Sequence, residues 1–257
     1  MIMCLDIGNT HIYGGVFKDE KLILRFRKPS QVRASSDEIG LFLKAVLREN
    51  DIDPDAIEAI GLCSVVPDAI YSTRSACKKY FDRSPFELNP ETKSGLKVSY
   101  HNPKDVGADR IANAIAACHM VPNRNLVIVD FGTATTFCAV SAQREYLGGV
   151  IAPGLRIGME ALEDRTAKLP PVEIIKKEHV IGQDTISSIQ SGVYFSNLGM
   201  VKEVLERIRH EAFSADAPFV IATGGFAYLF KESGLFNSIE TDLVLNGIRL
   251  AMCHTKE

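Results

Sequence analysis

The sequence has no apolar run that approaches the roughly 20 residues a helix needs to span a lipid bilayer. Its first ten residues, MIMCLDIGNT, lack a basic leader and a small-residue cleavage site, so we interpret them as the first strand of the mature protein. Lysine and arginine are scattered, and the net charge of −3 gives no reason to expect nucleic acid or an anionic membrane as a partner. We therefore expect a cytoplasmic, globular protein.

Metal and disulfide motifs are also missing. The six cysteines are widely spread without a CxxC pair, and several lie in apolar, strand-like runs, so we expect buried, reduced thiols. Apart from His11, the histidines form no i,i+4 pair and no HExxH pattern, so no zinc site is predicted. A chain of 257 residues can form one large domain or two of about 130 residues each.

One pattern occurs twice. Residues 1–10 and residues 127–136 (VIVDFGTATT) each form an apolar run that ends in aspartate, glycine and hydroxyl side chains. The glycine lets the chain turn closely, so that its amide and the threonine hydroxyls can face phosphate oxygens, while the carboxylate can hold a cation. One such turn is often a simple loop. Two copies, each followed by a similar hairpin, suggest a nucleotide held between two duplicated lobes.

The order of predicted elements is that of a mixed α/β protein, with helices covering the faces of a sheet. The junction between the two halves is expected near residues 119–125. Strands are predicted at 2–6, 12–17, 22–27, 57–66, 126–130, 136–140, 146–151 and 219–222; helices are predicted at 36–50, 68–81, 104–119, 155–166, 187–209 and 240–253.

Two further motifs carry chemistry. Thr223-Gly-Gly225 follows a predicted strand and is a candidate contact for a base and ribose. In Gly107-Ala-Asp-Arg110, Asp109 lies near a helix start, where backbone amides favour an anion, and Arg110 can hold a carboxylate or a transferring phosphate. Alone, this would be a surface ion pair. Between two phosphate turns it indicates a substrate site, because phosphoryl transfer needs a group that takes the hydroxyl proton.

These four motifs occur in the order and spacing of the type III pantothenate kinases, and the sequence resembles that family over essentially its full length. The family belongs to the acetate kinase, sugar kinase, Hsp70 and actin superfamily. The resemblance implies an α/β fold of two duplicated ribonuclease-H-like lobes, residues 1–118 and 119–257, with a nucleotide cleft between them. It also implies ATP-dependent phosphorylation of pantothenate to 4′-phosphopantothenate, the first step of coenzyme A synthesis.

The resemblance further assigns roles to single residues. Asp109 would be the catalytic base, Asp6 would lie near Mg²⁺, and Asp130 would bind a monovalent cation, potassium or ammonium. The ATP site would comprise Asp6, Ile7, Gly8, Asn9, Thr10, His11, Ile12, Tyr13 and Thr133, and the pantothenate site Tyr100, Gly107, Ala108, Asp109, Arg110 and Thr185.

Some of these assignments depend on the resemblance alone. By itself Tyr100 would be a half-buried strand residue, and Thr185 would be a helix N-cap. Asp184 replaces the family's usual asparagine beside Thr185. The family forms homodimers with substrate sites at the subunit interface. The apolar face of the helix at 187–209 could supply that interface, but packing in the core explains it equally well.

Two other functions remain open at this stage. Another enzyme of the superfamily, such as a sugar kinase or a polyphosphate-cleaving hydrolase, would share both aspartate turns, so that residues 107–110 and Tyr100 are the discriminating features. A nucleotide-dependent regulator without catalysis is the second alternative. The absence of a basic patch or helix-turn-helix signal argues against direct DNA binding, and the presence of Asp109 argues against an inactive enzyme.

Overall fold

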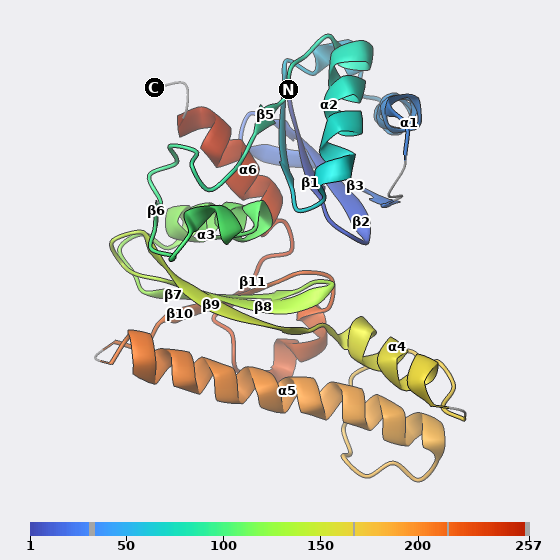
Figure 1. Ribbon diagram of the computed structural model, residues 1–257, viewed down its shortest axis with the longest axis vertical. Helices are drawn as coiled ribbons and strands as arrows, with labels where there is room; N and C mark the ends of the chain where they lie inside the picture. The colour runs from blue at the N-terminus through green and yellow to red at the C-terminus, as the bar shows by residue number, and fades with distance from the viewer. Residues whose placement is uncertain (31–33, 167, 215, 255–257) are drawn as a thin grey trace. The chain divides into compact units, whose positions relative to one another are not determined.

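The computed structural model describes residues 1–30, 34–166, 168–214 and 216–254, and these form two compact units (Figure 1). The first unit comprises Met1–Leu96, Tyr100–Ala116 and the chain from Leu243 onward. The second comprises Lys97–Ser99 and Ala117–Asp242. Among the described residues, no helix is both long and apolar enough to cross a membrane.

The first unit is built on a five-stranded sheet in the order β3-β2-β1-β4-β5. The central strand β1 pairs antiparallel with β2 and parallel with β4, and the β2–β3 hairpin extends the sheet on one side. The strand bounds are β1 Ile2–Ile7, β2 His11–Lys18, β3 Lys21–Pro29, β4 Ala59–Ser64 and β5 Phe86–Glu87.

The second unit repeats this topology. Its central strand β7 pairs antiparallel with β8 and parallel with β10, in the sheet order β11-β10-β7-β8-β9-β6. β7 thus corresponds to β1, β8–β9 to the hairpin β2–β3, and β10 to β4, which confirms the predicted duplication. The bounds are β6 Lys97–Val98, β7 Leu126–Phe131, β8 Ala134–Val140, β9 Glu145–Pro153, β10 Phe219–Thr223 and β11 Ser238–Ile239.

Six α-helices accompany the described parts of the two sheets. Helix α1 begins after an N-cap at Ser35: Glu38 N donates to Ser35 Oγ at 3.2 Å, and Ser35 N donates to Glu38 Oε2 at 2.7 Å, which closes a capping box. The helix bounds are α1 Ser36–Arg48, α2 Pro67–Phe81, α3 Ala108–Met120, α4 Leu155–Arg165, α5 Thr185–Ala212 and α6 Leu243–His254, with short 3₁₀ segments at Pro54–Ala56, Pro103–Asp105 and Ala227–Ser233.

The predicted helix start near Lys104 is wrong. Pro103–Asp105 instead forms a 3₁₀ turn whose N-cap is Asn102, and Val106 is extended, so α3 begins only at Ala108. Proline suits the first position of either kind of helix, so the sequence alone does not separate the two.

The apolar face of α5 packs in the core of the second unit. Val193, Tyr194 and Val201 are buried there, and Leu198 and Leu205 are partly buried against the same cluster. Of the two explanations left open by the sequence, core packing therefore accounts for this face.

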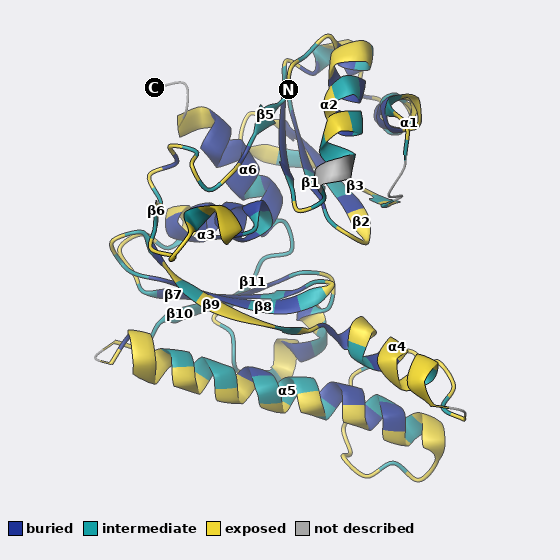
Figure 2. Cartoon of the chain, in the orientation of Figure 1, coloured by how far each residue is buried: buried dark blue, intermediate teal, exposed yellow. Residues whose placement is uncertain are grey.

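The last helix belongs to the first unit, whereas the sequence division at residues 118 and 119 places it in the second lobe. Helix α6 joins the first unit because its apolar side chains are buried along most of its length (Figure 2). Glycines allow this close packing: a Cβ on Gly61 would lie 2.3 Å from Met252 Sδ, and a Cβ on Gly247 would lie 1.9 Å from the Ala112 carbonyl oxygen.

We expect Gly247→Ala to lower the free energy of unfolding by about 1–3 kcal/mol or more, because the added methyl group would overlap the backbone of α3. Gly199→Ala is the matched control. Gly199 lies in α5 with nothing within 4 Å of an added Cβ, and alanine favours a helix over glycine by about 0.5–1 kcal/mol. Urea unfolding should give a lower midpoint for the first variant and an unchanged or higher one for the second. Equal midpoints would contradict the packing of α6 on α3.

Candidate active site

The first aspartate turn lies between β1 and β2 and is held on both sides. Gly8 N donates to the His11 carbonyl at 3.0 Å, which closes the turn. Ser30, at the end of the hairpin, donates its hydroxyl to the Gly8 carbonyl at 2.6 Å and its amide to the Thr10 carbonyl at 2.9 Å. Asn9, Thr10 and His11 are exposed, so the tip of a firmly anchored turn is accessible to a ligand.

Not every predicted ATP residue presents its side chain. Ile7 and Ile12 are 0% and 6% exposed and belong to the hydrophobic core, so they could contact a nucleotide only through their backbone. Tyr13 is half-buried, and the Arg27 guanidinium lies 4.6 Å from the centre of its ring. This cation–π contact adds a positive charge close to the strand that leaves the turn.

Asp109 is the second residue of α3 and folds back over the preceding turn. Arg110 N donates to Asp109 Oδ1 at 2.8 Å, and a Cβ on Gly107 would lie only 2.4 Å from the same oxygen. Glycine at 107 therefore makes room for the carboxylate. Burial raises the pKa of Asp109 above that of an ordinary carboxyl group, and the backbone N–H and the charge of Arg110 oppose this rise. A carboxylate of this kind is a stronger base than usual.

The negative charges of Asp6 and Asp109 both affect the buried thiol of Cys63. The β1–β4 register places Cys63 opposite Asp6, and the Cys63 thiol donates to Asp6 Oδ1 at 3.3 Å. Burial raises the pKa of Cys63, and the negative charges of Asp6 and Asp109 raise it further. Sequence reasoning did not single out Cys63, because the parallel pairing that brings it to Asp6 is not visible in the local pattern.

In the second unit, two predicted motifs meet at Asp130. Thr223 lies opposite Asp130 in the β7–β10 register. Gly224 follows with φ +87°, and a Cβ there would lie 2.4 Å from Asp130 Oδ1 and 2.6 Å from the Phe131 carbonyl carbon. The glycine thus allows both the left-handed backbone and the close approach. The carboxylate of the second turn is therefore half-buried, with Gly224 packed close against it.

Thr133 is exposed at the tip of the second turn and lies beside the start of α4. A Cβ on Gly154, the N-cap residue of α4, would lie 2.2 Å from the Thr133 carbonyl oxygen and 2.8 Å from that of Gly132. The turn and the first residues of α4 therefore pack backbone against backbone.

Thr185 is the first residue of α5, and Asp184, not Thr185, is the N-cap. Ser187 N donates to Asp184 Oδ1 and Ser187 Oγ donates to Asp184 Oδ2, both at 2.8 Å. Both residues line a shallow groove of about 650 Å³, together with Leu162, Leu169, Gln183, Ser188, Ile189 and Gly192. The aspartate that departs from the family pattern thus has a structural role that an asparagine can also fill.

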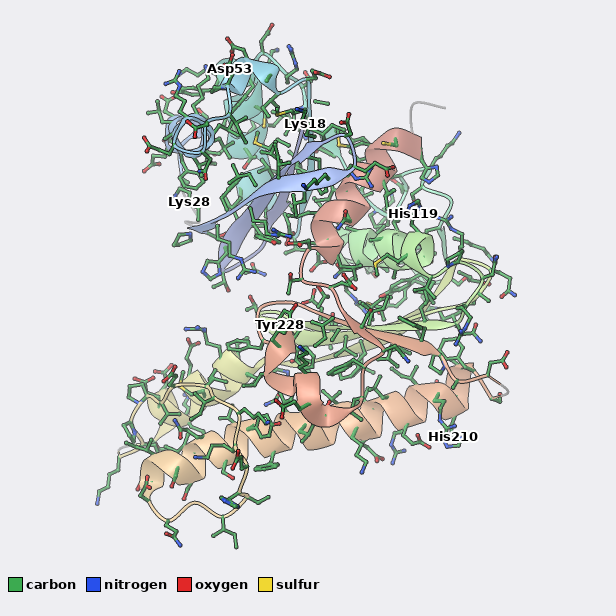
Figure 3. All side chains as sticks on the ribbon, turned by 180° about the vertical axis from the view of Figure 1, so that it is seen from behind. Lys18, Lys28, Asp53, His119, His210 and Tyr228 are labelled. Atoms are coloured by element: carbon green, nitrogen blue, oxygen red, sulfur yellow. The ribbon has the colours of Figure 1, made fainter. Side chains whose placement is uncertain are left out.

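Tyr100 and Arg110 are further predicted residues, whereas His119 and His210 are not part of the predicted site. Tyr100 is 37% exposed and Arg110 is 6% exposed, both in the first unit. His119 is in the last turn of α3, and His210 is near the end of α5, where its Nε2 lies 2.8 Å from Glu206 Oε1 (Figure 3). Among residues that the structure describes, no three His, Cys, Asp or Glu side chains gather as a metal cluster.

The fold is shared with solved structures of low sequence identity. A protein assigned to the Baf family of transcriptional activators from Campylobacter jejuni aligns over 99% of this chain and 98% of its own, with a TM-score of 0.61 and 17% identity. A protein assigned as an N-acetylglucosamine kinase from Porphyromonas gingivalis aligns over 99% of each chain, with a TM-score of 0.52 and 14% identity. The chain thus shares its α/β fold of two sheets with both of these proteins.

The particular family follows from sequence. Residues 2–207 match the family model described as type III pantothenate kinase. The type III pantothenate kinase of Legionella pneumophila (strain Corby) is 59% identical over 251 residues, which cover 98% of each chain. The chain belongs to the type III pantothenate kinase family.

We expect Asp184→Ala to lower the free energy of unfolding by about 1 kcal/mol, because the first turn of α5 loses its capping box. Asp184→Asn should change it by only a few tenths of a kcal/mol, since asparagine is an equally good N-cap. Thermal unfolding of both variants at neutral pH measures the difference. If the two variants melt together, well below the native protein, then the charge of Asp184 and not the cap is what matters.

Proposed function

We propose that the protein transfers the γ-phosphoryl group of ATP to the primary hydroxyl of pantothenate, which yields ADP and 4′-phosphopantothenate. This is the first step of coenzyme A synthesis. Membership of the type III pantothenate kinase family supports the reaction. The observation that carries the mechanism is the half-buried carboxylate of Asp109, which accepts a hydrogen bond from Arg110 N and has a raised pKa, in the motif Gly107–Arg110.

In this mechanism Asp109 accepts the proton of the pantothenate hydroxyl as its oxygen attacks the phosphorus. A general base is most effective when its pKa lies closer to the working pH than that of an ordinary carboxyl group, and burial shifts Asp109 in that direction. Arg110 and the backbone of Gly107 and Ala108 line the pantothenate side, with Tyr100 and Thr185 as further contacts. Catalysis is then mostly positioning and electrostatics.

The nucleotide is assigned to the two aspartate turns, with Asp6 to Tyr13 around the phosphates and Thr133 as a further ATP contact. Mg²⁺, when bound, would neutralise the phosphate charge, and it is commonly held in proteins by one or two carboxylates plus the substrate phosphates. Asp6, an oxygen ligand at the end of β1, fits that requirement. Asp130 is assigned to potassium or ammonium, for which its half-buried carboxylate offers oxygen ligands.

The assembly and compartment are further parts of the proposal. We infer a homodimer that works in the cytoplasm. Five of the six cysteines are buried free thiols and Cys253 is an exposed one, which agrees with a reducing compartment.

The first test is a coupled assay of ADP formation with purified protein, ATP and Mg²⁺. We expect ADP to depend on added pantothenate and to increase with potassium or ammonium. Glucose in place of pantothenate is the control for a sugar kinase, and omission of any acceptor is the control for a hydrolase. No pantothenate-dependent ADP with either cation would sink the proposal.

A second test separates the role of Asp109 in catalysis from its role in folding. We expect Asp109→Asn to lower kcat by about 10²- to 10⁴-fold, because the general base is lost. The same variant should be at least as stable as the native protein at pH 7. The raised folded-state pKa means that the folded protein binds this proton more tightly than the unfolded chain, so stability falls as pH rises from the unfolded-state value through the folded-state value.

The stability gain of Asp109→Asn should therefore shrink as the pH is lowered toward the ordinary carboxyl pKa of 3.8, because well below that pH the Asp109 carboxyl is protonated in both the folded and the unfolded state. Thermal unfolding between about pH 4 and 8 measures this trend, alongside kcat at pH 7. A variant that folds normally and retains nearly full kcat would show that Asp109 is not the base.

A further inference from the structure

Four side chains form one row across the first sheet. Arg27 on β3 lies opposite Tyr13 on β2, Tyr13 lies opposite Asp6 on β1, and Asp6 lies opposite Cys63 on β4. Directly opposed residues on neighbouring strands point to the same face of a sheet, so the row places Tyr13 and Cys63 on either side of the Asp6 carboxylate. The carboxylate is therefore flanked by a phenol ring and a thiol.

The contact between Cys63 and Asp6 has a defined chemical sense. Cys63 is 0% exposed, and its Sγ lies 3.3 Å from Asp6 Oδ1, within hydrogen-bonding distance for sulfur. A carboxylate oxygen can only accept a hydrogen bond, so the bond requires a protonated thiol that donates to it. The pairing of β4 with β1 holds the thiol in place. The hydrogen bond from this thiol therefore fixes the side-chain torsion angles of Asp6 and so the orientation of its carboxylate.

We propose that Cys63 is a positioning residue for the phosphoryl transfer: its thiol donates to Asp6 and holds that carboxylate in the orientation in which it binds the divalent cation of the nucleotide complex. The inference rests on the proposed function through the role of Asp6 near Mg²⁺. Cys63 itself touches neither substrate nor cation in this scheme.

The competing explanation is that Cys63 only fills space in the core. Cys77 provides the matched control. It is also 0% exposed and lies in the same unit, on α2, within a cluster of apolar side chains. Removing either sulfur leaves a small cavity, but only the removal of Cys63 deprives Asp6 of a hydrogen-bond donor.

The first experiment is calorimetric titration of ADP into the protein with Mg²⁺ and with EDTA. The ratio of the two dissociation constants measures the contribution of Mg²⁺. In Cys63→Ala we expect this ratio to fall by about three- to tenfold, the value of one modest hydrogen bond. Cys63→Ser should restore it to within about twofold, because the hydroxyl still donates. Cys77→Ala should leave it unchanged.

The proposal would be overturned if Cys63→Ala and Cys77→Ala had the same ratio of dissociation constants. It would also be overturned if the ratio in Cys63→Ser were as low as in Cys63→Ala. These titrations contain no pantothenate. If the native protein binds Mg²⁺ and ADP but forms no product from pantothenate, the proposed function is wrong. The effect of Cys63 on Mg²⁺-dependent ADP binding can still be measured in that case.

The second experiment does not depend on the stability of Cys63→Ala. The infrared difference between native protein and Cys63→Ser isolates the S–H stretch of Cys63. We expect it at a lower wavenumber than the Cys77 band isolated with Cys77→Ser, because an ionised acceptor forms the stronger hydrogen bond. The band should move back toward the Cys77 value in Asp6→Asn. The proposal would be overturned if the Cys63 band coincided with the Cys77 band, or if its wavenumber did not change in Asp6→Asn.

Discussion

The parallel pairing of each central strand with a strand distant in sequence is the constraint on which both candidate sites depend. In the first unit β1 pairs with β4, and in the second β7 pairs with β10. The antiparallel hairpin on the other side of each central strand is local and is formed by neighbouring residues. The distant strand instead decides what lies next to the aspartate: Cys63 beside Asp6, and Thr223 followed by Gly224 beside Asp130. The same topology thus gives two different environments.

The surroundings of Asp109 make its ionised form less favourable than that of an ordinary carboxyl group. Its burial disfavours the charged form, and the hydrogen bond from Arg110 N compensates only in part, since the pKa remains raised. Gly107 has no side chain to move the carboxylate outward, so the strain is electrostatic and not steric. A stable fold would not need this group at this place. Its presence is therefore better explained by chemistry than by packing, as expected for a perturbed carboxyl at a functional site.

Local features could be predicted from the sequence because their causes are local. The helix at α1, the two aspartate turns and the hairpins after them follow from residues within a few positions of one another. The start of α3 was misplaced because a 3₁₀ turn and an α-helix share the same N-terminal signals. The attachment of α6 to the first unit and the position of Cys63 depend on contacts across large sequence separations, which no local pattern encodes.

The environments of Asp6 and Asp130 differ between the two units. An added Cβ at Gly224 would lie 2.4 Å from the Asp130 carboxylate oxygen, so this carboxylate packs closely against the glycine that follows β10. Around Asp6 the neighbours are a thiol donor and, through that thiol, the charge of Asp109. Both carboxylates raise the pKa of this thiol, which favours its protonated, hydrogen-bond-donating form. The repeated turn therefore presents its aspartate to different surroundings in the two units: a buried thiol in the first, and Thr223 followed by Gly224 in the second.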